Sequence, residues 1–310
     1  MSGPVSTDDA APEAANDPPA GPEVELIPGR EAQVGSLTVR RVLPRRPRRT
    51  VGAWCFLDHM GPVEVSGANS PDIGPHPHMG LQTVTWLLAG ELVHRDSLGS
   101  EQPIRPGQLN LMTAGHGVVH AEENTGGYRG PLQGAQLWVA QPGATRDGPP
   151  AFEHHGELPR LEFSGAEVTI LVGDLAGTAS PARRDTDHLG VDLVLRSPGA
   201  TIPLRAEYEH ALAVLEGVVT VGGQLARPGM LAYLGSGREE CRLETTGPAR
   251  ALLIGGVPLG EQILMWWNFV ARTREEVSTA RQQWMDGDER FGPVDSDLAR
   301  IPVGPPPWEV

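Results

Sequence analysis

TVTWLLAGELVH (residues 83–94) has a counterpart later in the chain, HALAVLEGVVTV (residues 210–221), with a glycine at the same place in both. A second pair follows in the same order, RPGQLNLMTAG (residues 105–115) and RPGMLAYLGSG (residues 227–237). Two segments repeated in one order indicate a structural unit that occurs twice. At 310 residues the chain is also longer than one ordinary domain of roughly 150 residues, and a duplication accounts for that length.

Both copies are predicted to consist of strands. The apolar runs are short, and turns rich in glycine and proline, 39 and 30 residues in all, separate them. Such spacing is typical of an all-β sandwich or barrel. Near the end of the chain Thr273 and Glu276 form a capping-box pattern, and Val277, Ala280 and Trp284 recur at helical spacing. We therefore expect an all-β protein with one short C-terminal helix.

The polar segment QPGATRDGPP (residues 141–150) is the predicted boundary between the copies. We assign residues 23–150 to an N-terminal unit. Residues 151–310 form a C-terminal unit that includes the helix and the tail. Residues 1–22 are rich in proline, alanine and aspartate and are predicted to be disordered.

Composition restricts the classes of partner. A formal net charge of -14 repels a phosphate backbone, so we expect no direct nucleic-acid binding. The basic segment at residues 40–49 fits either a contact with an acidic protein partner or a solvated strand edge. The sequence shows no signal peptide, no apolar run of the roughly 20 residues that span a membrane, and only two cysteines. We expect a cytoplasmic protein.

Four candidate metal ligands occur in two pairs within the N-terminal unit. One residue separates His76 from His78, and one residue separates His120 from Glu122. Because alternate residues of a strand face the same side, each pair presents two ligands together, and two adjacent strands would bring all four close. Imidazole and carboxylate ligands suit Fe(II), Mn(II), Ni(II), Cu(II) or Zn(II).

The C-terminal copy serves as an internal control. Alignment of the repeats places Pro203 and Arg205 opposite the histidine pair, and Arg242 and Glu244 opposite the second pair. A purely structural role would not explain why the whole set occurs in one copy and is absent from the other. We expect metal only in the N-terminal unit.

Several longer motifs resemble the pirin family, whose members are bicupins. These are TVGAWCFLDHMGPVE (residues 50–64), HPHMGLQTVTW (residues 76–86), MTAGHGVVHAE (residues 112–122), QLWV (residues 136–139) and ILMWWNFVARTREEV (residues 263–277). The resemblance implies two tandem cupin-type β-barrels. It also implies one metal ion per chain, usually iron, bound by His76, His78, His120 and Glu122 in the N-terminal cupin, with a metal-free C-terminal cupin.

The chain also departs from the family pattern. Met79, Leu81 and Gln82 replace the Arg, Phe and Glu of the frequent family sequence HPHRGFET, and His116 replaces an Arg. Since these residues flank the ligands, substrate choice is not carried over from other members.

The remaining polar and aromatic residues have structural explanations. We expect Asp58 and His59 to form a turn hydrogen bond. Gln136 and Trp138 line the cavity or pack in the core, and Trp266 packs between the terminal segment and a barrel. We assign no role to His94, His154, His155, His188 or His210.

Two functions from different classes fit these observations. The resemblance implies a quercetin 2,3-dioxygenase-type oxidoreductase that uses Fe(II) and O2 on a flavonol or related phenolic, with Glu122 as ligand and base. The alternative is a non-catalytic iron- or redox-sensing protein that regulates a protein partner such as a transcription factor. A purely structural metal would require a closed coordination shell.

Overall fold

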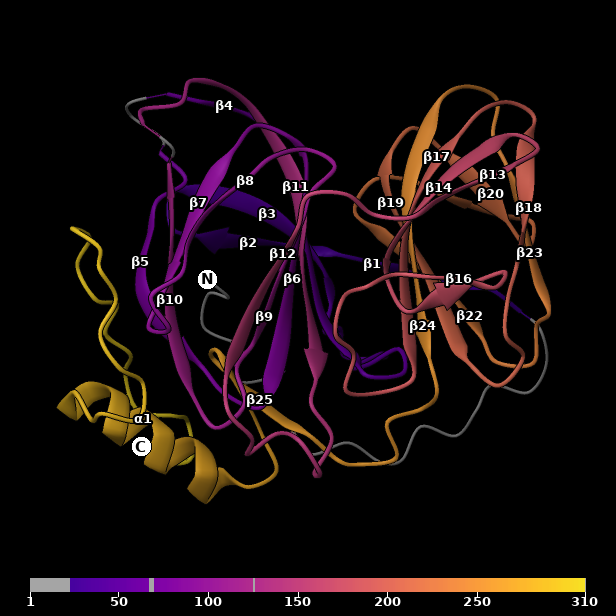
Figure 1. Ribbon diagram of the computed structural model, residues 1–310. Coiled ribbons are helices and arrows are strands. Elements are labelled where there is room, and N and C mark those ends of the chain that lie inside the picture. The colour runs from indigo at the N-terminus through magenta and orange to yellow at the C-terminus, as the bar shows by residue number, and fades with distance from the viewer. Residues whose placement is uncertain (1–22, 67–69, 125, 310) are drawn as a thin grey trace.

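The structure is a computed structural model that describes residues 23–66, 70–124 and 126–309. The chain forms two β units side by side, with one helix, α1 (Arg274–Asp286), beneath the first (Figure 1). The all-β prediction with a short C-terminal helix is confirmed. The segment predicted to be disordered, residues 1–22, lies outside the described residues. No helix in the described part of the chain has the length and apolar character needed to span a bilayer.

The first unit consists of two antiparallel sheets. In spatial order the larger sheet contains β12 (Ala151–His155), β9 (Leu109–Thr113), β6 (Leu81–Ala89), β11 (Gly130–Ala140), β4 (Trp54–Val65), β3 (Leu37–Leu43) and β2 (Arg30–Val34). The smaller sheet contains β5 (Ile73–His78), β10 (Val118–Asn124), β7 (Leu92–Asp96) and β8 (Glu101–Ile104). Apolar side chains from both sheets pack together, and this contact forms the interior of the unit.

The second unit repeats this plan. Its larger sheet contains β1 (Glu25–Pro28), β22 (Met230–Gly235), β19 (Glu209–Glu216), β24 (Ala249–Gly256), β17 (His188–Leu195), β14 (Ala166–Val172) and β13 (Arg160–Phe163). Its smaller sheet contains β18 (Gly199–Pro203), β23 (Glu240–Glu244), β20 (Val219–Val221) and β21 (Gln224–Ala226). Two hairpins pair β15 (Asp174–Leu175) with β16 (Thr178–Ala179) and β25 (Leu264–Trp266) with β26 (Phe269–Ala271). The strand orders of the two units correspond position by position, as the sequence repeat predicts.

The units exchange their edge strands. β1 precedes the first unit in the chain but pairs with β22 of the second. β12 lies just beyond the predicted boundary at residue 150 and pairs with β9 of the first unit. The proline-rich segment at residues 141–150 therefore marks the turn before β12. The units defined by strand pairing differ from the predicted units, because β1 belongs to the second and β12 to the first.

A tryptophan joins the two units. Trp54 of β4 donates its indole Nε1–H to the carbonyl oxygens of Leu189 (3.0 Å) and Gly255 (3.1 Å) in the second unit. A Cβ at Gly190 would lie 2.9 Å from the Trp54 ring, so only glycine allows this approach. The buried indole is thereby both packed and hydrogen-bonded, which fixes one unit against the other.

The helix has the predicted cap. The Thr273 hydroxyl accepts a hydrogen bond from the Glu276 amide, and Gly287 ends the helix in the left-handed region with φ 73°. Its buried face consists of Val277, Ala280 and Trp284.

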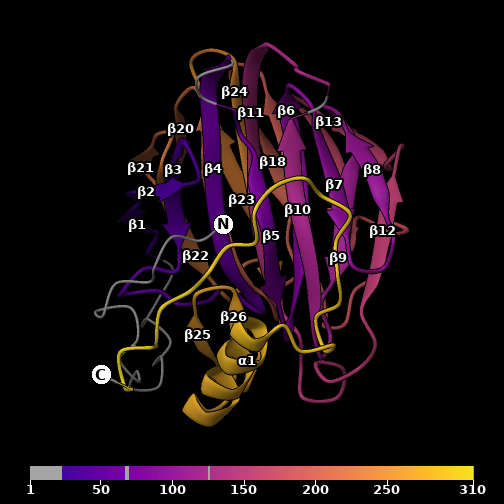
Figure 2. The same cartoon turned by 90° about the vertical axis from the view of Figure 1, so that its left-hand side faces the viewer.

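The C-terminal segment packs against the first unit, although we predicted it with the second. The Val270 amide donates to the Met79 carbonyl oxygen (3.0 Å), and Trp266 belongs to the same apolar cluster as Met79. Farther along, the Ile301 amide donates to the Pro75 carbonyl oxygen of β5 (2.9 Å). Figure 2 shows this tail crossing in front of β5 and β10. The tail therefore covers the strands that carry the candidate ligands.

Candidate metal centre

Three histidines meet between β5 and β10. The antiparallel register places His76 opposite His120. One nitrogen from each ring of His76, His78 and His120 lies within 4.8 Å of the others, and the Nε2 atoms of His78 and His120 are 3.1 Å apart. All three residues are at most 2% exposed. The structure thus brings together three of the four residues that the sequence pairs.

Burial determines the protonation of these rings. Loss of hydration lowers the pKa of each of the three histidines well below its ordinary range, and the neighbouring imidazoles act in the same direction. All three are therefore neutral at pH 7, and each keeps one nitrogen lone pair. Converging buried lone pairs are unfavourable without a partner, and a divalent ion supplies one. The donor set fits a transition metal.

The local sequence of β5 helps to orient the first candidate ligand, His76. Pro75 and Pro77 alternate with the histidines and lack amide hydrogens, which is acceptable because β5 is an edge strand of its sheet. His76 Nδ1 lies 2.8 Å from the Gly74 carbonyl oxygen, so Nδ1–H donates to it. Nε2 of His76 then remains free as an acceptor.

Glu122 occupies a different position from the three histidines. It follows His120 by two residues on β10 and lines the same cavity. However, a register shift lies between these two residues, and Glu122 pairs with Ile73. The group whose ligand atoms lie within 4.8 Å of one another contains the three histidines without the Glu122 carboxylate.

The cavity around the rings has a volume of about 30 Å³, which is room for a water-sized molecule. One wall is aromatic, because Phe56 and Trp138 stack with their ring centroids 4.0 Å apart. Trp138 also meets the His78 ring edge-on at 5.2 Å. Gln136 lines the same cavity.

Another wall is aliphatic, and the tail packs behind it. Val34, Val39 and Ile73 line the cavity, and Ile301 packs against the cluster that they form. The C-terminal tail therefore supports the cavity wall from outside.

A buried ion pair adjoins the cavity. Arg41 of β3 donates two hydrogen bonds to the Asp58 carboxylate of β4 (2.8 and 2.7 Å), and its guanidinium lies 4.6 Å from the Phe56 ring centroid. The expectation of a turn at Asp58 and His59 is wrong, since both lie within β4. Asp58 faces the cavity.

His94, to which the sequence assigned no role, contacts the centre. Its Nδ1 lies 3.2 Å from His120 Nδ1, and its Nε2 lies 2.9 Å from the Asp96 carboxylate. Burial opposes the charge on Asp96, but hydrogen bonds from His94 and Ser100 outweigh burial, and the pKa of Asp96 lies below its ordinary value. His94 and Asp96 are separated by one residue on β7, so the same strand rule that paired the other ligands would have paired these two.

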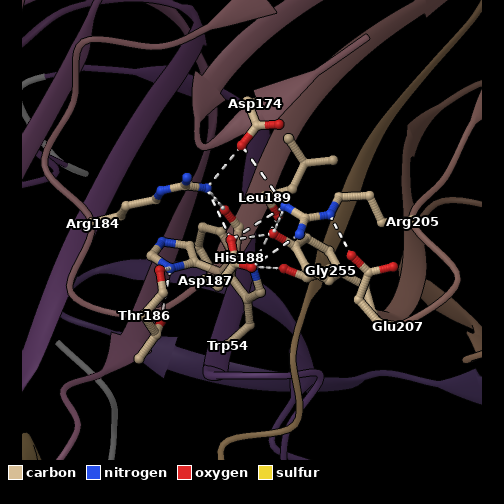
Figure 3. Close-up of polar contacts among 11 residues, drawn as sticks. Trp54, Asp174, Arg184, Thr186, Asp187, His188, Leu189, Arg205, Glu207 and Gly255 are labelled. Atoms are coloured by element: carbon tan, nitrogen blue, oxygen red, sulfur yellow. Dashed lines mark hydrogen bonds and ion pairs between the residues drawn. The ribbon is translucent and has the colours of Figure 1, made fainter. Parts of the chain in front are cut away.

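The second unit has ion pairs around the residue that the sequence repeat aligns with His78. Arg205, which aligns with His78, contacts the carboxylates of Asp187 (3.2 Å) and Glu207 (2.8 Å) and donates to the Tyr208 hydroxyl (2.7 Å). Figure 3 shows Arg184 joining this network through Asp187. The strand register differs from this sequence alignment, because Thr201 lies opposite Arg242 as His76 lies opposite His120, and Arg205 lies beyond the end of β18.

The interior of the second unit is aliphatic. Side chains of β14, β17, β19, β22 and β24 form one continuous buried cluster. Arg242 and Glu244, which align with His120 and Glu122, pair with each other at the surface (3.0 Å). Within the described residues, the three-histidine group is the one cluster of at least three closely spaced His, Cys, Asp or Glu ligand atoms.

A larger hollow of about 480 Å³ lies beside α1. Part of its charged lining is already paired, since Arg146 makes a two-point contact with Glu276 (2.7 and 3.0 Å). Arg290 donates to the His116 carbonyl oxygen and to Gln283. The three histidines do not line this hollow, and we place the chemistry in the smaller cavity.

Comparison with known proteins agrees with this architecture. The family model described as Pirin matches residues 36–139, and the model of the Pirin C-terminal cupin domain matches residues 191–292. A Pseudomonas aeruginosa protein provisionally assigned as a quercetin 2,3-dioxygenase is 46% identical, covering 93% of this chain and 92% of that protein. A pirin-like protein of Caulobacter vibrioides is 35% identical, covering 87% of this chain and 96% of that protein. The crystal structure of a quercetin 2,3-dioxygenase from Acinetobacter baumannii superposes with a TM-score of 0.88 at 44% identity, covering 92% and 96% of the two chains.

Proposed function

The chain belongs to the pirin family, and from that premise we propose that it is a dioxygenase that uses Fe(II) and O2 to cleave a flavonol of the quercetin type or a related phenolic. The observation that carries the proposal is the cluster of three buried, neutral histidines in the first cupin. Relatives named for this activity align across both cupins, which supports the substrate class.

The residues of the first cupin have distinct roles in this proposal. His76, His78 and His120 would hold the ion, and Glu122 would complete the ligand set. The bound metal supplies a Lewis acid for the substrate oxygens and a redox partner for O2. The Glu122 carboxylate would accept the proton of the flavonol 3-hydroxyl group. Ring opening then takes up O2 and releases carbon monoxide.

The small volume of the cavity limits access of the substrate. Small-molecule sites usually have volumes of about 300 to 1,000 Å³, whereas this cavity has about 30 Å³. A flavonol therefore requires the wall to move. The tail packs against the wall from outside the sheets, and at Ile301 it is held by hydrogen bonds to Pro75 and from Trp284. We assign it the role of the movable wall.

The same small cavity also favours the second candidate function. A centre that admits O2 but no larger molecule suits a protein whose metal changes oxidation state and thereby alters its affinity for a protein partner. In that case no phenolic would be consumed.

The deciding experiment is anaerobic reconstitution with Fe(II), followed by measurement of metal per chain and of O2 uptake with and without quercetin and a panel of related phenolics. Parallel samples with Mn(II), Ni(II), Cu(II) and Zn(II) identify the preferred ion. We expect metal-dependent uptake that His120→Ala abolishes and that Arg242→Ala, a change at the aligned position of the second cupin, leaves intact. One iron per chain with no phenolic-dependent uptake would overturn the enzyme proposal and favour the redox sensor.

A further inference from the structure

A line of polar contacts runs from the histidine cluster through two side chains of β7 to the backbone of the turn that follows it. His120 Nδ1 meets His94 Nδ1 (3.2 Å), and His94 Nε2 meets Asp96 Oδ2 (2.9 Å). Asp96 Oδ1 accepts the amides of Leu98 and Ser100, both at 2.9 Å. His94 and Asp96 are buried, at 6% and 3% exposed. The contacts between the side chains of His120, His94 and Asp96 therefore form away from bulk water.

The strand register explains why these groups meet. β7 and β10 pair so that Asp96 lies opposite His120 and His94 lies opposite Glu122. A further contact fixes the plane of the middle ring, because Phe152 of β12 stacks on His94 with the centroids 4.3 Å apart and 10° between the planes. His94 therefore has a defined orientation between the carboxylate and the ligand.

The Asp96 carboxylate determines which ring nitrogens of His94 and His120 carry hydrogen. A carboxylate only accepts hydrogen bonds, so His94 Nε2 must carry the hydrogen that faces Asp96. In a neutral ring the other nitrogen is then an acceptor, and His94 Nδ1 can accept only if His120 Nδ1 is protonated. This arrangement leaves His120 Nε2, the atom that faces His78, with a free lone pair.

We propose that Asp96, acting through His94, is a positioning residue that sets the tautomer of His120 and keeps its Nε2 available for the metal. The inference rests on the metal centre of the proposed function, but it concerns hydrogen positions that exist before metal binds. Ligand histidines commonly donate their second N–H to a carboxylate or carbonyl group. His76 does so directly, to Gly74, whereas His120 does so through a second imidazole.

Asp96→Asn provides the sharpest test, because it should reverse the donor and acceptor in each hydrogen bond between residue 96, His94 and His120. The two backbone amides require an oxygen, so the side-chain NH2 of the asparagine would face His94 Nε2 and make it an acceptor. His94 Nδ1–H would then donate to His120 Nδ1, and the proton of His120 would move to Nε2. His94→Phe is the companion variant, since it keeps a ring to stack on Phe152 but removes both nitrogens.

The first measurement uses the full-length, metal-free protein labelled with ¹⁵N in its histidines. Long-range ¹H–¹⁵N spectra at pH 7.5 report the tautomer of each ring, and the loss of signals in His120→Gln assigns His120. We expect the Nδ1–H tautomer in the wild type and the Nε2–H tautomer in Asp96→Asn. An Nε2–H tautomer or a charged ring at His120 in the wild type would overturn the proposal, whatever the variants do.

The second measurement is the Kd for Co(II), titrated anaerobically as a probe ion. We expect Asp96→Asn to weaken binding by roughly ten- to a hundred-fold, and His94→Phe to weaken it as well. Asp192→Asn is the matched control, because Asp192 is equally buried and pairs with Arg250 in the second cupin. Co(II) binding that is tight in the wild type and unchanged in a folded Asp96→Asn would overturn the inference alone. A wild type that binds no metal, with the expected tautomer present, would overturn the proposed function instead.

Discussion

A histidine can serve as a metal ligand only if one nitrogen is unprotonated and correctly aimed, and single residues control both conditions here. Burial keeps His76, His78 and His120 neutral. The Gly74 carbonyl group and the His94 ring contact the second nitrogen of two of them. The ligands thus depend on neighbours that bind nothing themselves.

Removing single ligands should remove the metal. We expect His78→Ala and His120→Ala each to lose most of the bound iron, because two imidazoles hold a divalent ion poorly. Arg205→Ala and Arg242→Ala, at the aligned positions of the second cupin, should retain it. Elemental analysis of the purified variants after reconstitution measures this, and equal metal loss in all four would contradict a single site in the first cupin.

Substitution of Glu122 should affect metal binding less than substitution of the histidines does, and should still affect O2 uptake. Its carboxylate lies outside the close group of ligand atoms, so we expect Glu122→Gln to weaken Fe(II) binding less than His120→Ala does. If Glu122 accepts the substrate proton, phenolic-dependent O2 uptake should nevertheless fall at least ten-fold. A metal titration and an uptake assay on the same samples separate these effects, and full activity in Glu122→Gln would exclude the role as base.

The sequence pairs the candidate ligand histidines because strand alternation places residues two apart on the same side of a strand. The same alternation relates His94 to Asp96, but nothing in the sequence shows that β7 pairs with β10. The sequence also treated Glu122 as equivalent to His120. The register shift that separates them depends on pairing with β5, which alternation within one strand does not reveal.

At the scale of elements, the tail after α1 is the part of the first cupin that periodicity could not place. It has no repeating apolar pattern, and its partners are the β5 backbone and the Trp284 indole. A Cβ at Gly74 would lie 2.2 Å from the Ala299 carbonyl oxygen. The tail therefore approaches β5 as closely as a glycine permits.

Loosening the tail should open the metal cavity. We expect Ile301→Ala and Gly74→Ala to increase the rate at which a chelator removes bound Co(II), because the first shortens the wall and the second pushes the tail away. Val303→Ala is the control, since Val303 packs against the α1 cluster instead of the cavity wall. Stopped-flow absorbance gives the rates, and identical rates in all four proteins would show that the tail does not control access.

At the scale of the whole molecule, buried neutral histidines make stability depend on pH. Burial lowers the pKa of His59, His188 and His210 to about 4, whereas the unfolded value is about 6.5. As the pH falls below 6.5 the unfolded chain binds protons that the folded chain does not, so stability is lost between pH 6.5 and about 4.

The histidine at the interface between the cupins allows a direct test. His188 meets the Trp54 ring edge-on at 5.3 Å, and His188→Phe keeps an aromatic ring there. We expect this variant to lose stability less steeply with acid, by up to about 1.4 kcal/mol per pH unit. Urea unfolding of metal-free protein from pH 7.5 to pH 5 measures the slopes. A slope equal to that of the wild type would show that His188 is protonated in the folded state.

The exchange of β1 and β12 limits where the gene could be divided to give two separately encoded cupins. Phe152, which stacks on His94, lies on β12, after the turn at which composition divides the chain. A gene fragment cut at that turn would encode all three histidine ligands but not the ring that orients the second imidazole. It would also lack the edge strand that completes the sheet. Each unit therefore depends on a strand from across the composition boundary, and recombination at that boundary would separate the candidate metal ligands from Phe152.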